Sequence, residues 1–271
     1  MKKTWMIPML AVAMMLSACS SEDDLQWGAG EGKVSFALDV PTEVNYVETR
    51  AESGYQLPAE LVPAADDFAL QMTGNYLNEA NQTQNYTGSW VTVAAFHTER
   101  PDLQAGTYSA TFTHGESGVE GVGKAYFTGE VTDFAVKANK TVTQQVTCAL
   151  ANSCFTLEVS EWMLNYYDDI KLTIHTAQNS FSYSMNSTEK TELVFVNPAQ
   201  VLSFSGSAVK AQNGVAVEFP KTPIGSTLAA ETLYAVKVDH GTAGAGSLSI
   251  SFDGTFTEVA EQQIELNPDV E

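Results

Sequence analysis

Apolar side chains recur at every second position in many short segments of this sequence. The clearest segments are 34–40, 108–112, 142–150, 155–159, 170–174, 193–195, 215–219 and 248–252. A period of two places alternate side chains on opposite faces of the backbone, so each segment predicts a strand with one buried face. We therefore expect an all-β protein.

Turn signals separate these segments. Asn213-Gly214 and Asp253-Gly254 are typical of short hairpins, because glycine adopts positive φ at no steric cost. One stretch, residues 160–168, predicts a helix of one or two turns, with Ser160 as its cap. Many short strands separated by tight turns favour antiparallel β-sandwiches, of the immunoglobulin or transthyretin type.

A weak internal sequence repeat predicts two such sandwiches in tandem. Residues 103–108 and residues 228–234 each precede a strand, a glycine-rich loop and a final strand pair. We place the first domain at 33–150 and the second at 151–271, with almost no linker between them.

The N-terminus departs from this pattern. Lys2 and Lys3 precede an apolar run that ends in small residues, which is the layout of a secretory signal peptide over residues 1–18. The run is too short to span a bilayer. Leu16-Ser17-Ala18-Cys19 resembles the lipobox of bacterial lipoproteins, in which cleavage precedes a diacylated cysteine. We predict lipidation at Cys19; the alternative is an ordinary signal peptide with a cysteine nearby.

Residues 19–32 are acidic and rich in glycine, so they predict a flexible tether. The acids after the cysteine also resemble the stretch that sends lipoproteins of Bacteroidota-type bacteria to the outer face of the outer membrane, although such acids are common in linkers too. We expect a lipid-anchored, surface-exposed protein whose membrane contact is its N-terminal lipid.

Charge narrows the choice of partners. The chain has 13 basic and 33 acidic residues, and removal of residues 1–18 takes away two lysines and no acid, so the net charge falls from −20 to −22. Such a surface repels phosphates and carries no basic stripe that would release counterions. We therefore expect no nucleic-acid partner.

Two cysteines remain once Cys19 is assigned to lipid. Cys148 and Cys154 lie six residues apart with the same strand parity, so a disulfide would need a tight reversal between them. We expect two buried thiols, while an exported chain keeps the disulfide open as an alternative. No metal-ligand spacing is present, and we expect no metal and no cofactor.

Catalytic motifs are missing. Residues 118–125 nearly spell a phosphate-binding loop, but Ala125 stands where the motif needs Ser or Thr, and the segment continues as a strand. We interpret it as a flexible hairpin loop. No nucleophile elbow or zinc-binding helix occurs, and the four histidines are scattered. We therefore predict a protein that is not an enzyme.

Two features suggest interactions instead. Sugar rings stack on exposed aromatic faces, but we expect Trp90 and Trp162 to belong to the cores, which leaves the ligand-binding residues unknown. Arg50, one of two arginines, lies in a polar stretch that a trypsin-like protease would find easily. Cleavage there would free the first strand and open a groove for a neighbour's strand; the alternative is a solvated loop arginine.

Several motifs occur together in a familiar order. They are the lipobox, the acidic tether, Gly32–Leu38, Thr49-Arg50-Ala51, Asp67-Phe68, Trp90, residues 103–108 and Val146–Asn152. In this order the chain resembles the DUF4493 family of Bacteroides-type lipoproteins, which is distantly similar to two-domain fimbrillin and fimbrial-anchor lipoproteins. The resemblance implies a β-rich, surface-exposed protein of unknown function. Residues 181–230 match nothing in it, and Cys154 stands where an aliphatic residue is expected.

These observations favour a non-catalytic adhesion or fimbria-related assembly module at the cell surface, with other surface or fimbrial proteins as partners. The alternative is a glycan-binding surface lipoprotein of a polysaccharide-utilisation system.

Overall fold

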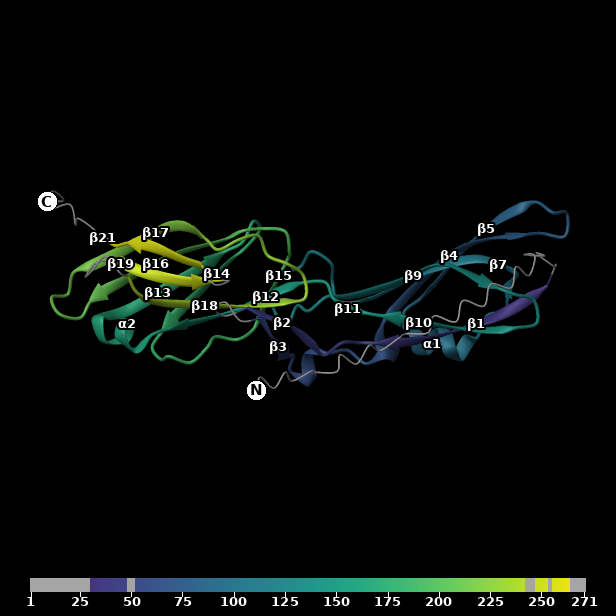
Figure 1. Ribbon diagram of the computed structural model, residues 1–271, viewed down its shortest axis with the longest axis horizontal. Coiled ribbons are helices and arrows are strands. Elements are labelled where there is room, and N and C mark those ends of the chain that lie inside the picture. Colours follow the sequence, from purple (N-terminus) through teal and green to yellow (C-terminus); the bar gives the residue numbers. More distant parts are fainter. Residues whose placement is uncertain (1–29, 48–51, 242–246, 253–254, 264–271) are drawn as a thin grey trace, which may run out of the picture.

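The computed structural model describes residues 30–47, 52–241, 247–252 and 255–263. Two bodies built almost entirely of strands lie end to end along one long axis (Figure 1). Each body pairs two sheets around its own apolar core. The predicted fold class, all-β with two tandem sandwiches, is confirmed.

The first domain packs a five-stranded sheet against a three-stranded one. The larger sheet has the order β11-β9-β7-β4-β5 and the smaller one the order β10-β1-β6. The strands are β1 (Glu31–Asp39), β4 (Ala69–Leu77), β5 (Thr83–Trp90), β6 (Leu103–Gln104), β7 (Gly106–His114), β9 (Phe127–Val136), β10 (Thr141–Thr147) and β11 (Ala149–Leu150).

The second domain packs an eight-stranded sheet against a five-stranded one. The larger sheet runs β20-β19-β18-β12-β15-β8, with the β2–β3 hairpin paired to β18, and the smaller one runs β14-β13-β16-β17-β21. The strands are β2 (Glu43–Val47), β3 (Glu52–Gln56), β8 (Gly121–Val122), β12 (Ser153–Val159), β13 (Tyr167–His175), β14 (Ser180–Met185), β15 (Val194–Val196), β16 (Leu202–Lys210), β17 (Ala216–Ile224), β18 (Thr232–His240), β19 (Ser247–Phe252), β20 (Thr255–Ala260) and β21 (Gln262–Gln263).

The helices are short. α2 (Glu161–Tyr166) forms where the sequence predicts it, and the Ser160 hydroxyl accepts the Met163 N–H as its cap. The expectation of a single helical stretch is wrong, because α1 (Val93–Glu99) forms as well. Thr92 caps α1, and Val93 and Phe96 bury its inner face. Two 3₁₀ turns, η1 (Ala59–Leu61) and η2 (Ala65–Asp67), complete the helical part.

Most strand pairs are antiparallel, as expected, but three are parallel. β1 pairs with β10, β12 with β18, and β18 with β2. Parallel neighbours need a long crossover. In this chain the crossovers carry whole hairpins, so each parallel pair joins strands far apart in sequence.

One sheet serves both cores. Along β12, β15 and β18, one set of alternate side chains faces the core of the second domain, while Cys154, Phe195 and Leu233 face the core of the first. Strand register places these three side by side, because Cys154 is opposite both Phe195 and Leu233. All three are at most 2 % exposed. We call Phe195, Cys154 and Leu233 the junction row.

Segments from the first half of the chain also cross the junction. β2 pairs with β18 and β8 pairs with β15, so the larger sheet of the second domain incorporates strands that precede residue 150. The boundary between residues 150 and 151 stays a prediction, and the two halves interlock around it. Within the described ranges, no helix has the length and apolar character needed to cross a membrane.

Candidate functional site

The first strand of the chain lies in the middle of a sheet. β1 runs between β10 and β6, and its pairing with β10 extends from Lys33 to Asp39. The Phe36 ring, 4 % exposed, lies 5.3 Å from Phe96, 5.0 Å from Phe112 and 5.8 Å from Phe134, measured between ring centroids. Displacement of β1 would therefore uncover an aromatic groove.

The chain then continues into the other domain. The Asn45 N–H donates to the Glu231 carbonyl at 2.8 Å, and Val44 is buried in the first core from the second sheet. Arg50, the predicted cleavage site, follows β2 and lies outside the described residues, as does Cys19, the predicted lipidation site. The segment that cleavage at Arg50 would release thus includes strands in both domains.

A half-buried carboxylate joins the domains at a second point. Glu120, in the loop between β7 and β9, accepts hydrogen bonds from four groups of the second domain. They are the Thr176 hydroxyl at 2.6 Å, the Gln200 amide at 2.8 Å, the Asn179 amide at 3.0 Å and the Asn197 N–H at 3.0 Å. Burial raises the pKa of Glu120, but these hydrogen bonds outweigh burial and lower it below its ordinary value.

The Glu120 contacts change the interpretation of residues 118–125. No helix follows the loop, in agreement with the rejection of a phosphate site, and β8 leads instead to a strand pair with β15. The predicted flexible hairpin loop is nevertheless attached to the second domain through the hydrogen bonds of Glu120. Sequence reasoning missed these contacts, because nothing in the local pattern connects Glu120 with residues 176–200.

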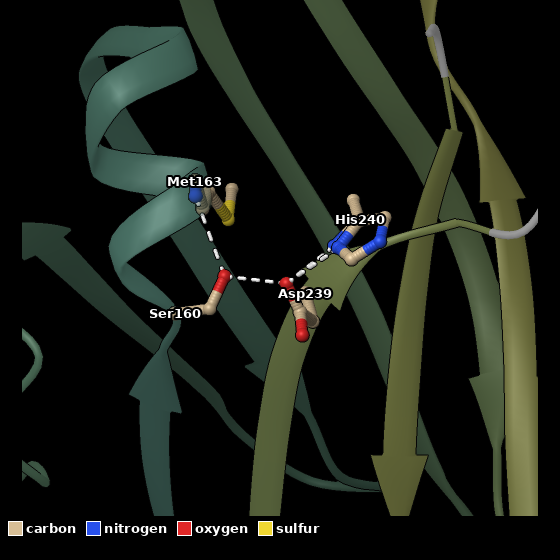
Figure 2. A network of polar contacts seen from close by, with 4 residues as sticks. All are labelled: Ser160, Met163, Asp239 and His240. Carbon is tan, nitrogen blue, oxygen red and sulfur yellow. Dashed lines mark hydrogen bonds and ion pairs between the residues drawn. The ribbon is translucent and has the colours of Figure 1, made fainter. Parts of the chain in front are cut away.

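A serine, an aspartate and a histidine meet at the far end of the second domain (Figure 2). The Ser160 hydroxyl donates to Asp239 Oδ1 at 2.6 Å, and His240 Nδ1 lies 3.0 Å from the same oxygen. A hydrolytic triad needs the serine to donate to the histidine. Here both contact the aspartate, so this cluster is a helix cap tied to β18, not a nucleophile paired with its base.

Both tryptophans expected in the cores are half-buried against them. The Trp90 ring packs edge-on against Phe96 and its Nε1 donates to Glu99 at 2.6 Å. The Trp162 ring stacks on Tyr166, with centroids 4.8 Å apart.

The two remaining cysteines are buried free thiols, as expected, and do not form the alternative disulfide. Burial raises the pKa of Cys148 to about 11, with the Asp39 carboxylate adding to the rise, and raises the pKa of Cys154 to about 12. Thiols in this state are poor nucleophiles. They serve the first core, and Cys154 belongs to the junction row.

A polar site lies on the outer face of the smaller sheet of the second domain. It is a shallow trough of about 560 Å³ across β14, β13, β16 and β17. Its polar side chains are Lys171, Thr173, Ser182, Ser184, Ser205, Ser207, Glu218 and Lys221. We call this the serine trough. Thr173 and Ser182 share a hydrogen bond of 2.9 Å across the strands.

Strand register orders these hydroxyls into rows. Lys171 is opposite Ser184 on one side and Ser207 on the other, and Ser207 is opposite Glu218. At the next level Thr173 is opposite Ser182 and Ser205. Neighbouring strands lie about 4.8 Å apart, so the rows form a regular grid of groups that can each donate and accept.

His175 closes the grid at one end. Its Nδ1 lies 2.8 Å from the Ser180 hydroxyl and its Nε2 lies 2.8 Å from the Ser205 hydroxyl. Burial lowers the pKa of His175, and the nearby Lys221 charge lowers it further. The histidine is therefore neutral at pH 7 and orients Ser205.

The first domain carries a comparable face without the lysines. A shallow hollow of about 340 Å³ on β4, β5 and β7 is lined by Thr73, Asn75, Asn85, Thr87, Thr107, Ser109 and Asp133, among others. Its only charged side chain is an acid. Within the described ranges, no group of three or more His, Cys, Asp or Glu side chains is placed to hold a metal ion.

Comparisons with known proteins give a family and several distant structures. The family model described as "Domain of unknown function (DUF4493)" matches residues 30–268. No curated protein matches the chain.

Among solved structures, a candidate cell adhesion protein from Bacteroides eggerthii DSM 20697 is 11 % identical, with 88 % of this chain and 98 % of that chain covered and a TM-score of 0.41. The fimbrial anchor protein Mfa2 from Porphyromonas gingivalis is 11 % identical, with 86 % and 100 % covered and a TM-score of 0.34.

Proposed function

The chain belongs to the DUF4493 family, and from its own residues we propose that it is a surface-anchored, non-catalytic module for adhesion and fimbria-related assembly. Three elements support the proposal: a lipobox at Cys19, an acidic tether, and an elongated pair of sandwiches whose first strand is inserted between two others. The protein is proposed to be held in the outer membrane by lipid at Cys19 and exposed on the cell surface.

The position of β1 carries the assembly part of the proposal. β1 fills an aromatic groove and is followed, after β2, by Arg50. After cleavage at Arg50, only main-chain hydrogen bonds and side-chain packing would retain β1. A strand of matching pattern from a neighbouring subunit could then take its place by strand addition.

An arginine-specific protease tests this assembly step, because the chain contains only Arg50 and Arg100. In the Arg100→Lys variant Arg50 is the sole target, and cleavage is expected to give oligomers in size-exclusion chromatography. The double variant Arg50→Lys with Arg100→Lys has no arginine, so it is the matched control and is expected to stay uncut and monomeric. Resistance of Arg50 to cleavage, or cleavage without a change of assembly state, would remove the strand-exchange role.

Cys19→Ser tests the anchor. Without the thiol no lipid can be attached, so the variant is expected to leave the membrane fraction of bacterial cells, while Cys148→Ser is expected to remain there. A Cys19→Ser protein that still fractionates with membranes would refute lipid anchoring. Surface exposure is measured separately, by protease accessibility on intact cells.

A second candidate function is glycan capture at the cell surface. The observation in its favour is the array of hydroxyl and amide groups on two outer sheet faces, since such groups hydrogen-bond sugar hydroxyls. One face is formed by β14-β13-β16-β17 of the smaller sheet of the second domain, and the other by β4, β5 and β7 of the larger sheet of the first. A glycan array probed with the purified mature protein tests it. Binding at background level across neutral and charged glycans would exclude this function.

A further inference from the structure

The serine trough differs from the rest of the molecule in its charge. The chain has a net charge of −20 with only 13 basic residues, yet the trough has two lysines and a single acid, Glu218. Within the described part of the chain, neither Lys171 nor Lys221 forms an ion pair. Two unpaired cations in one hollow of an otherwise acidic protein favour an anionic ligand by charge complementarity.

The spacing of the lysines indicates an extended ligand. Lys171 lies on β13 and Lys221 on β17, and β16 runs between these strands. Lys221 is also offset from Lys171 by two residues along the sheet, because Lys171 is opposite Ser207 and Lys221 lies at the level of Ser205. Two strand spacings and this offset place the lysine backbones about 12 Å apart, which is the span of a short sugar chain rather than of a single small ion. Ser205 and Ser207 of β16 lie between the lysines and offer hydroxyl partners along that span.

The backbone gives Lys221 its position. The register of β16 against β17 shifts between Phe204 and Gly206, which is a β-bulge that places Pro220 and Lys221 opposite Ser205. A bulge bends its strand and redirects the local side chains. Lys221 also lies close enough to His175 for its charge to act on the imidazole, so it is associated with the same hydroxyl grid.

We propose that the serine trough binds an anionic oligosaccharide, with sugar hydroxyls on the serine rows and carboxylate or sulfate groups on Lys171 and Lys221. The inference gives the glycan-capture function a ligand class and rests on it. Charge-assisted hydrogen bonds from lysine are about twice as strong as neutral ones. The two lysines therefore supply most of the preference for an anionic over a neutral oligosaccharide, while the hydroxyls hydrogen-bond the sugar rings and position them.

The test is calorimetric titration of the purified mature protein with three oligosaccharides of equal length: a carboxylated oligogalacturonide, a sulfated dextran fragment and neutral dextran. We expect the anionic chains to bind at least about tenfold more tightly than the neutral one, because only they can accept charge-assisted hydrogen bonds from the two lysines. The two anionic arms distinguish a carboxylate from a sulfate ligand.

Matched variants locate the site. Lys171→Gln with Lys221→Gln is expected to lose about tenfold or more in affinity for the anionic chain. Lys137→Gln with Lys140→Gln makes the same change of charge on exposed lysines of the first domain and is expected to leave binding unchanged. Ser182→Ala with Ser207→Ala is expected to weaken binding while the fold, followed by circular dichroism, stays intact.

The outcomes separate the proposals. Equal affinity of the trough variants and the wild type, or an equal loss in the Lys137 and Lys140 control, would overturn this site while glycan capture stands. Binding of neutral dextran alone would also overturn the anionic ligand and leave glycan capture in place. If the protein binds no glycan in the titrations or on the array, both the anionic-ligand site and the glycan-capture function are excluded. The assembly role would still depend on the protease test described above.

Discussion

The two domains close their cores in different ways. Every buried residue of the second core lies between Phe155 and Val259, so that core is built from one continuous part of the chain. The first core takes Cys154, Phe195 and Leu233 from the larger sheet of its neighbour. The exchange between the cores is therefore unequal: the first core takes three fully packed side chains from the second domain, whereas the second core receives only the partly buried Val47 from the described residues before residue 150.

This asymmetry explains the near absence of a linker. Leu150 ends the first core and Cys154 already belongs to the junction row, so the few residues between them have no room to act as a hinge. Interfaces that bury large apolar side chains from both sides move little. The body is consequently a stiff rod, and the Glu120 contacts secure the same junction with polar groups.

The largest effect is expected from separating the domains. A fragment of residues 30–150 lacks the junction row, whose large side chains contribute about 1.5–3 kcal/mol each when buried, a substantial share of the roughly 5–15 kcal/mol that stabilises a domain. We expect this fragment to lose cooperative unfolding in urea and residues 151–271 to retain it. Sigmoidal unfolding of the 30–150 fragment, followed by Trp90 fluorescence, would contradict the asymmetry.

A single substitution in the junction row should reproduce part of that effect. Phe195→Ala leaves a cavity at a fully buried site and is expected to cost about 3–5 kcal/mol. The loss of stability should appear mainly in unfolding followed by Trp90 fluorescence, measured in a Trp162→Phe background so that Trp162 does not contribute to the signal. The matched control, Val196→Ala, changes the adjacent residue that faces the second core, and its smaller effect should appear mainly at Trp162 in a Trp90→Phe background.

Glu120→Gln tests the polar side of the junction. Loss of the carboxylate weakens four hydrogen bonds and is expected to cost about 1–3 kcal/mol in the free energy of unfolding at pH 7. Glu116→Gln, on an exposed residue of the same loop, is the control. Equal stability of the two variants would show that the apolar junction row acts alone.

The same variant has a defined pH dependence. The pKa of Glu120 is lower in the folded protein than in the unfolded chain, so its stabilising contribution is present above the unfolded pKa and is lost as pH falls through the folded one. The difference between wild type and Glu120→Gln should therefore shrink on acidification below about pH 4.

The smallest effect is expected far from the junction. Ser160→Ala removes the cap of α2 and its bond to Asp239, for a loss of about 1 kcal/mol. Unfolding followed by Trp162 fluorescence should show this loss of stability, whereas unfolding followed by Trp90 fluorescence should not. Ser160→Thr keeps the cap and should restore most of the stability.

Alternation predicted β1, β7 and β13, which have one buried face, and also β12 and β19, in which apolar residues alternate with polar ones. It missed β18, because this strand is covered on both sides: Leu233 faces the first core and Tyr234 the second, so the segment is continuously apolar. It missed β5 for the opposite reason, since that edge strand is largely polar. α1 was missed although Thr92 offers the same kind of side-chain cap as Ser160 does for the predicted α2.

The candidate sites were less accessible to sequence reasoning. Glu120 and its partners lie 56 to 80 residues apart in the chain, and the serine trough depends on the order of four strands. Local patterns carry no information on strand order. Cys154 stood out in the sequence as a departure from the aliphatic residue expected there, but nothing in the sequence connected it with the junction between the domains.

The insertion of β1 beside β10 has a mechanical consequence. β1 begins at the outer end of the first domain and runs along the long axis toward the second (Figure 1). When tension is applied between an N-terminal anchor and a load at the opposite end, it acts along this strand, and the paired stretch from Lys33 to Asp39 is loaded in shear. Its hydrogen bonds then break together instead of unzipping in turn, which is the loading geometry in which a sheet withstands the greatest force.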